Sequence, residues 1–164
     1  MGSSLQDLEE RIGALEATVG ALRDRAAIQD LRFRYHIAVN DRELDSIGSL
    51  FTEDATVDFG GIGSARGRKQ IEALYEQVVG GAPFVKQFIH NHTITLNGDR
   101  ASGLSYLEAK TVTHGESYMV AARFDDEYLR DRGEWRFVRL ALVPYFVVPL
   151  REGWAGEEKI RLSP

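Results

Sequence analysis

The second half of the chain consists of four long segments in which apolar and polar residues alternate, and this pattern strongly limits the possible folds. Three short turn sequences separate the segments: Asn97-Gly98-Asp99, His114-Gly115 and Arg132-Gly133. Alternation with a period of two is typical of β-strands, and turns of this kind favour tight hairpins. The pattern therefore predicts an antiparallel meander with strands at residues 84–96, 101–113, 116–129 and 135–148.

The first half of the chain has mainly helical spacing. Its apolar residues predict helices at residues 27–38, 44–51 and 69–79, with a strand at 55–59 and a glycine-rich turn after it. Helices followed by a long meander favour an α+β fold, in which the helices lie on one face of a strongly curved, mostly antiparallel sheet. The curvature predicts an internal cavity, the usual kind of small-molecule site.

Heptad spacing distinguishes the first residues of the chain. Apolar residues recur at alternating spacings of three and four, at Leu5, Leu8, Ile12, Leu15, Val19, Leu22 and Ala26. This pattern fits a short two-stranded coiled coil, or a long amphipathic helix that lies against its own domain or a neighbour's. We expect residues 1–25 to form this helix, residues 26–164 to form the domain, and the protein to be a homo-oligomer, either dimer or trimer.

Composition excludes several classes of function. The net charge is -5 and acids and bases are mixed along the chain, which argues against a nucleic-acid partner. The chain lacks both a long apolar run and a basic leader, so we expect no membrane partner and a cytoplasmic location. It has no cysteine, and His90 and His92 have no third ligand at a recognisable spacing. We therefore predict no metal and no cofactor.

Several strings resemble the SnoaL-like branch of the nuclear-transport-factor-two-like superfamily. In chain order they are AIQDLRFRYHIAVNDRELDSIGSLFTEDATVDF, ARGRKQIEALY, HNHTITLNGDRASGLSYLEA, ARFDDEYLRDRGEWRF and PYFVVPLREGW. The resemblance covers nearly everything after Arg25 and implies a cone-shaped domain. The superfamily includes dehydratases, isomerases, polyketide cyclases, carbon–carbon lyases and plain binding proteins, so the fold alone does not define an activity.

The resemblance also implies a helix tyrosine, an aspartate five residues later and a strand histidine. Tyr35 matches the tyrosine, whereas the aspartate position falls on Asn40, next to Asp41, and the histidine position on Gln87. Amides cannot act as a base, but Asn40 and Gln87 can orient a substrate or an oxyanion by hydrogen bonds. Tyr35 is then the predicted acid or base, and a core tyrosine with a satisfied hydroxyl is the alternative.

Strand alternation decides which residues near Gln87 face the predicted cavity. It places Asn91 toward the cavity, as a substrate-binding residue, and His90 and His92 away from it. A β-bulge would reverse this for one histidine, and His90 is therefore the second candidate proton carrier.

Three further residues are predicted to bind substrate. Asp126 and Arg139 are candidates for an interior pair that holds a polar ligand end, with a structural or rim salt bridge as the alternative. Tyr118 is one of several aromatic residues in the later strand segments, and these residues favour a flat, apolar ligand. His36 is expected to point away from the buried helix stripe.

These residues predict a cofactor-independent lyase or isomerase. The reaction would be a dehydration, elimination, double-bond shift or retro-aldol-type cleavage of a small hydrophobic molecule, aromatic or polycyclic, with a hydroxyl or carbonyl group. The alternative is a non-catalytic ligand-binding or assembly module that has lost the histidine–aspartate dyad.

Overall fold

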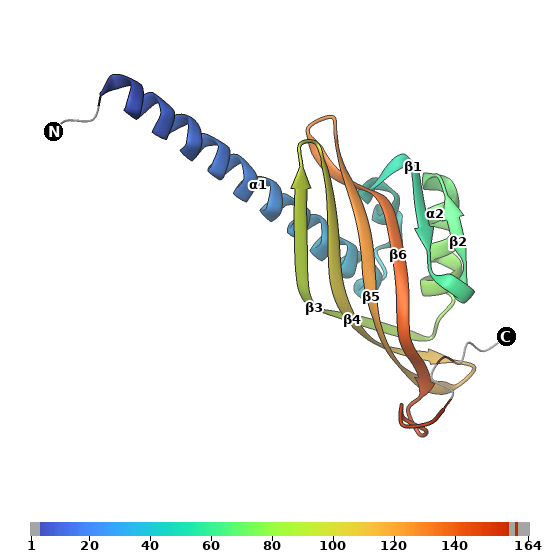
Figure 1. Ribbon diagram of the computed structural model, residues 1–164. Helices are drawn as coiled ribbons and strands as arrows, with labels where there is room; N and C mark the ends of the chain where they lie inside the picture. The colour runs from blue at the N-terminus through green and yellow to red at the C-terminus, as the bar shows by residue number, and fades with distance from the viewer. Residues whose placement is uncertain (1–3, 158–159, 161–164) are drawn as a thin grey trace.

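The computed structural model describes residues 4–157 and 160, which form an α+β fold of one long helix, several short helical segments and a curved six-stranded sheet (Figure 1). The sheet has the strand order β2-β1-β6-β5-β4-β3. The elements in chain order are α1 (Leu5–Asp41), η1 (Leu44–Leu50), β1 (Phe51–Asp58), η2 (Gly60–Ile62), β2 (Ser64–Arg66), α2 (Arg68–Tyr75), η3 (Glu76–Gly80), β3 (Phe84–Asn97), β4 (Arg100–Thr113), β5 (Glu116–Asp131) and β6 (Glu134–Pro149).

The predicted meander is confirmed. Strands β3 to β6 pair antiparallel in sequence order, and each connecting turn contains a glycine with positive φ: Gly98 at 58°, Gly115 at 79° and Gly133 at 86°. A β-carbon is disfavoured in this region of φ, so these glycines set the hairpin positions. Strand β1 adds to β6 in parallel, and the short strand β2, which follows the glycine-rich turn, was not predicted.

The helical predictions need two corrections. Residues 44–50 form a 3₁₀ helix rather than an α-helix, and α2 ends at Tyr75, followed by a π-helical turn through Gly80. At the predicted boundary near Arg25 the backbone does not break, because α1 continues through it to Asp41. No helix in the described ranges is long and apolar enough to cross a membrane.

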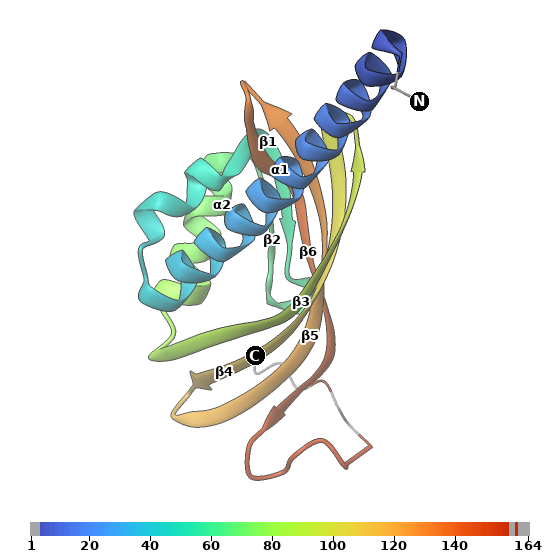
Figure 2. The same cartoon turned by 90° about the vertical axis from the view of Figure 1, so that its left-hand side faces the viewer.

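Only the second half of α1 packs on the domain. Residues 4–20 are all exposed and the helix extends past the sheet, whereas Ile28, Leu31 and Tyr35 are buried (Figure 1). Helices α1 and α2 lie on the concave side of the sheet, which curves around them (Figure 2). The core lies between α1 and strands β5 and β6, with Phe124, Phe137 and Leu140 fully buried.

Candidate functional site

A buried ion pair joins α1 to the middle of the sheet. The side chains of Arg32 and Asp126 form it, and both have zero exposure. The Arg32 guanidinium carbon also lies 4.5 Å from the ring centroid of Phe124, in cation–π geometry. Burial raises the pKa of Asp126 and the charge of Arg32 opposes this rise. The pair therefore places a compensated charge inside an aromatic core.

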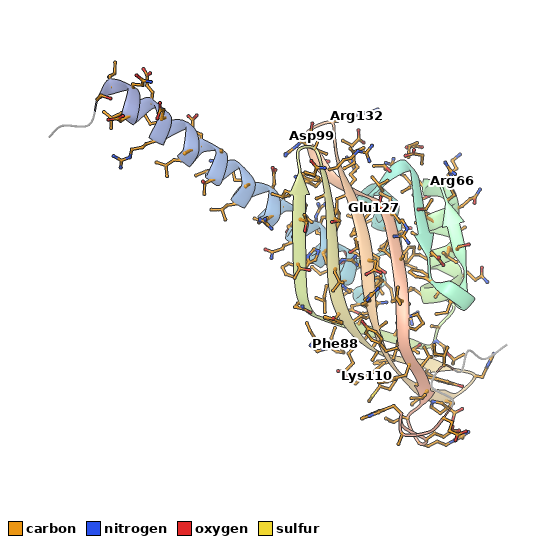
Figure 3. The ribbon with its side chains drawn as sticks, in the orientation of Figure 1. Arg66, Phe88, Asp99, Lys110, Glu127 and Arg132 are labelled. Carbon is orange, nitrogen blue, oxygen red and sulfur yellow. The ribbon has the colours of Figure 1, made fainter. Side chains whose placement is uncertain are left out.

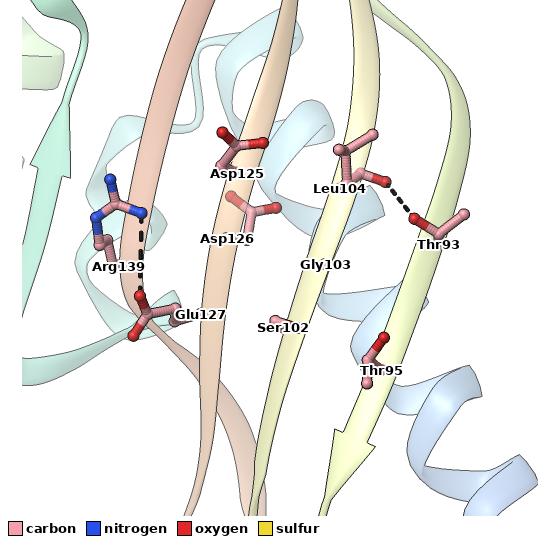
Figure 4. A pocket seen from close by; sticks show the side chains of 9 residues that line it. All are labelled: Thr93, Thr95, Ser102, Gly103, Leu104, Asp125, Asp126, Glu127 and Arg139. Atoms are coloured by element: carbon pink, nitrogen blue, oxygen red, sulfur yellow. Dashed lines mark hydrogen bonds and ion pairs between the residues drawn. The ribbon is translucent and has the colours of Figure 1, made fainter.

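This ion pair corrects the predicted partner of Asp126. Arg139 does not reach Asp126, because it projects from the opposite face of the sheet, where its Nη1 is 3.9 Å from Glu127 Oε1 (Figure 4). The sequence does contain a signal for the true partner. Arg32 lies three residues before Tyr35 on the buried stripe of α1, and a charge in such a stripe requires a buried partner.

A hydrogen-bonded chain extends from Asp126 to a histidine. The Tyr128 hydroxyl donates to Asp126 Oδ2 at 2.8 Å, and His92 Nε2 is 3.0 Å from the same hydroxyl. Because the tyrosine proton goes to Asp126, the tyrosine oxygen accepts from His92, which assigns the imidazole proton to Nε2. His92 Nδ1 is therefore an unprotonated acceptor, and it is buried without a hydrogen-bond partner in the described residues.

A β-bulge places His92 on the concave side. The register of β3 against β4 shifts between Ile89 and His92, so His92 lies opposite the buried Ser105. Asn91 is exposed, and its predicted position toward the interior is wrong. The bulge turns His92 inward rather than His90, which is exposed and has its Nε2 3.8 Å from Glu108 Oε2.

Tyr35 is fully buried beside this chain of hydrogen bonds. Its hydroxyl accepts a hydrogen bond from the Tyr75 hydroxyl at 3.0 Å. Burial raises the pKa of Tyr35 to about 12, so the phenol is neutral near pH 7 and its own proton is available for donation. The Arg32 guanidinium carbon is 4.9 Å from the Tyr35 ring centroid.

Asn40 and Gln87 are neighbours, as the resemblance implies for the two dyad positions. Asn40 Nδ2 donates to the Gln87 carbonyl at 2.8 Å, and the Gln87 N–H donates to Asn40 Oδ1 at 2.7 Å. Both ends of the Asn40 amide therefore hold β3 against α1. The Gln87 side chain has a buried Oε1 without a hydrogen-bond partner in the described part of the chain.

His36 is buried, contrary to the expectation that it points away. The curved sheet covers a wide arc of α1, so both Tyr35 and His36 are enclosed, with ring centroids 5.1 Å apart. Burial and the nearby Arg32 charge lower the pKa of His36 to about 3, and the same causes lower that of His92 to about 4. Both imidazoles are therefore neutral at physiological pH.

Buried polar atoms without partners gather in this region. We call the residues that carry them the interior polar cluster: Arg32, His36, Gln87, His92, Ser105 and Asp126. Buried polar groups are nearly always hydrogen-bonded, so such a concentration indicates groups that a ligand or water would satisfy. Tyr118 lies further along β5, half-buried and opposite Thr111, and its role stays a prediction.

Two hollows open on the outer face of the sheet, away from α1. One, of about 330 Å³, lies over β3, β4, β5 and β6 and is lined by Thr93, Thr95, Ser102, Gly103, Leu104, Asp125, Asp126, Glu127 and Arg139 (Figure 4). The other, of about 470 Å³, is bordered by Tyr106, Tyr145, Phe146 and Trp154. Phe88 and Lys110 lie together near the same end of this face (Figure 3). The predicted internal cavity stays a prediction.

Metal ligands do not gather in the described residues, where no three His, Cys, Asp or Glu side chains form a group that could hold an ion. The acceptors of the interior polar cluster are instead arranged around one arginine. This arrangement can transfer protons and form hydrogen bonds.

A long helix on the concave face of a curved sheet, with polar groups buried between them, defines a nuclear-transport-factor-two-like fold. Within this class, the chain belongs to the SnoaL-like domain family, whose model matches residues 20–141. An uncharacterised protein of Mycobacterium tuberculosis is 29% identical over 126 residues, covering 74% of this chain and 86% of the relative.

Two comparisons point to enzymes of the same family. The gamma-hexachlorocyclohexane dehydrochlorinase of Sphingobium indicum is 31% identical over 135 residues, covering 79% of this chain and 85% of the relative. A crystal structure of a hexachlorocyclohexane dehydrochlorinase, LinA type 2, superposes with a TM-score of 0.77 and 26% identity over 90% of this chain and 97% of that one.

A third comparison shows the fold alone. A scytalone-dehydratase-like protein of Novosphingobium aromaticivorans superposes with a TM-score of 0.73 at 18% identity, covering 90% of this chain and 98% of that one. The dehydrochlorinases show that the relatives of this chain include a lyase that acts on a small molecule.

Proposed function

We propose that this chain is a cofactor-independent lyase that eliminates a proton and a leaving group from neighbouring carbons of a small hydrophobic ring compound. The observation that carries the proposal is His92, a half-buried imidazole with a buried, unprotonated Nδ1 whose other nitrogen is held by the Tyr128 hydroxyl, itself bonded to Asp126. Burial and the Arg32 charge lower the pKa of His92 to about 4, so its Nδ1 is unprotonated at physiological pH and can accept a proton from a substrate as a general base. Membership of a family with a dehydrochlorinase supports the same class of reaction.

The proposed reaction moves one proton and one leaving group. His92 Nδ1 takes the proton from carbon, the electrons of the C–H bond form the double bond, and the leaving group departs with the electrons of its own bond. The Tyr128 hydroxyl, which accepts from His92 Nε2, holds the imidazole in position while Nδ1 takes the proton. A halide leaves unassisted, whereas a hydroxyl leaves as water after it takes the Tyr35 proton. Gln87 and His36 have free polar atoms that can orient a carbonyl or hydroxyl.

The two histidines of β3 provide a matched test. We expect His92→Ala to lower turnover by about 10²- to 10⁴-fold, the usual contribution of a general base, and His90→Ala to retain activity because His90 is on the outer face. Gamma-hexachlorocyclohexane and cyclic β-hydroxy ketones serve as probes. Chloride release and gas chromatography of the alkene measure the reaction.

The leaving group separates the roles of the other residues. Tyr35→Phe should slow water loss by about 10²-fold or more and chloride loss much less, because only hydroxide needs a proton. Gln87→Ala should raise KM more than it lowers kcat, since an amide that only orients the ligand contributes equally to ground and transition states. Equal losses in His90→Ala and His92→Ala would contradict the proposal. Ring compounds that bind without turnover would support the binding-module alternative.

A further inference from the structure

The outer side of α1 carries apolar residues that the domain does not cover, in one run from Leu5 to Ala26 and, beyond the exposed Gln29, at Phe33 and Ile37. Its large side chains are between 43% (Val19) and 76% (Leu5) exposed: Leu5, Leu8, Ile12, Leu15, Val19, Leu22, Phe33 and Ile37. We call this set the α1 stripe. A free helix would leave this surface in water, and exposed contiguous apolar surface of this kind marks an interaction site.

The stripe faces directly away from the domain. At the junction, Asp24 accepts hydrogen bonds from Arg130 and Trp135, and Ile28 is fully buried on the sheet. Leu22 and Ala26 alternate with these residues along the helix and are exposed. At 100° per residue, the two sets lie on opposite sides of the helix. A partner helix can therefore approach the α1 stripe without meeting the sheet below.

We propose that α1 pairs with α1 of a second copy of this chain as a parallel, two-stranded coiled coil. The heptad places Ile12 and Val19 at the a position, and Leu8, Leu15 and Leu22 at the d position. β-Branched residues at a and leucine at d favour parallel dimers over higher oligomers. The segment from Leu5 to Ala26 spans about 33 Å at 1.5 Å per residue.

Charges beside the stripe favour the parallel direction. Arg11 occupies a g position and Glu16 the following e position, so a parallel pair places each Arg11 beside Glu16 of the partner subunit. An antiparallel pair instead places Glu9 near Glu16 of the partner subunit, and like charges repel. Phe33 and Ile37 continue the stripe along the packed half of α1, so the two sheets would lie on the outer sides of the helix pair.

The absence of native cysteine makes the orientation directly measurable. In a parallel pair, position 8 faces position 8 of the partner, so full-length Leu8→Cys should form a disulfide-linked dimer under mild oxidation at micromolar concentration. Glu10→Cys is the matched control, because it lies on the far side of the same turn and should stay monomeric on the non-reducing gel. Adding Leu15→Glu should abolish the Leu8→Cys cross-link and lower the mass measured by light scattering.

Each outcome decides the proposal. A Leu8→Cys chain that does not cross-link, or that cross-links no faster than Glu10→Cys, overturns the coiled coil. A disulfide that forms only between Leu8→Cys and Val19→Cys chains overturns the parallel direction, because antiparallel helices pair an a position with a d position. Because residues 4–20 are exposed and lie beyond the domain, circular dichroism of Leu15→Glu should still show the native sheet.

Discussion

At the scale of single residues, the Arg32–Asp126 pair is an ion pair whose two side chains are both fully buried in the core. Two charges with zero exposure have lost their hydration, and they compensate each other only while both are present. Tyr128 adds a hydrogen bond to the same carboxylate. The polar chain that orients His92 therefore depends on this pair.

We predict that Arg32→Met lowers the free energy of unfolding by about 3–5 kcal/mol, because it leaves Asp126 buried without a counter-charge. Arg139→Met is the matched control on the outer face and should cost less than about 1 kcal/mol. Urea unfolding measures both. The double variant Arg32→Met, Asp126→Leu should recover much of the loss, and an Arg32→Met protein as stable as its parent would show that the pair contributes nothing.

At the scale of elements, α1 has two unequal halves. The half that contains Tyr35 is packed on the sheet, whereas the exposed half before Ala21 is held by local interactions within the helix and by the Ser4–Asp7 capping box. Gly13 and Gly20 lie within this exposed half, and a β-carbon at either position meets no atom within 4 Å. Both glycines therefore weaken the helix without a packing reason.

Replacing Gly13 and Gly20 by Ala should stabilise this half of α1 by about 0.5–1 kcal/mol per site, since alanine loses less backbone entropy in a helix. Amide hydrogen exchange should slow for residues 8–20 and stay unchanged in β5. Gly98→Ala is the contrasting variant, because φ is 58° there and a side chain strains the hairpin. Unchanged exchange in the helix would contradict the prediction.

At the scale of the whole molecule, the buried histidines link stability to pH. The folded-state pKa of His36 is about 3, below the ordinary value of 6.5, so between these values the unfolded chain binds a proton that the folded chain does not. The contribution of the neutral His36 side chain to the free energy of unfolding is fully present above pH 6.5. It is lost as the pH falls toward 3, by about 1.4 kcal/mol per pH unit.

We therefore predict that His36→Leu flattens the dependence of the unfolding free energy on pH. The difference between wild type and variant should change by up to about 1.4 kcal/mol per unit between pH 6 and pH 4. Urea unfolding at several pH values provides the measurement. If the curves of wild type and His36→Leu run parallel, the pKa of His36 is the same in the folded and unfolded chain, and the prediction is wrong.

Local sequence determined most of the elements of this protein. Turn glycines at 98, 115 and 133 and period-two alternation act over a few residues, so the meander and its strand ends follow from the chain alone. The α+β class and the inward position of Tyr35 follow from the same periodicities. The 3₁₀ form of residues 44–50 and the short strand β2 have no comparable local signal.

Tertiary structure decided the site. Arg32 and Asp126 are separated by 94 positions, and only the packing of α1 on the sheet brings them together, whereas Arg139 projects from the opposite face. One extra residue at a bulge decided that His92 faces inward, because strand parity reverses wherever the register shifts. Spacing along a strand predicts which residues share a face. The partner across that face depends on contacts between distant segments, which a linear pattern does not encode.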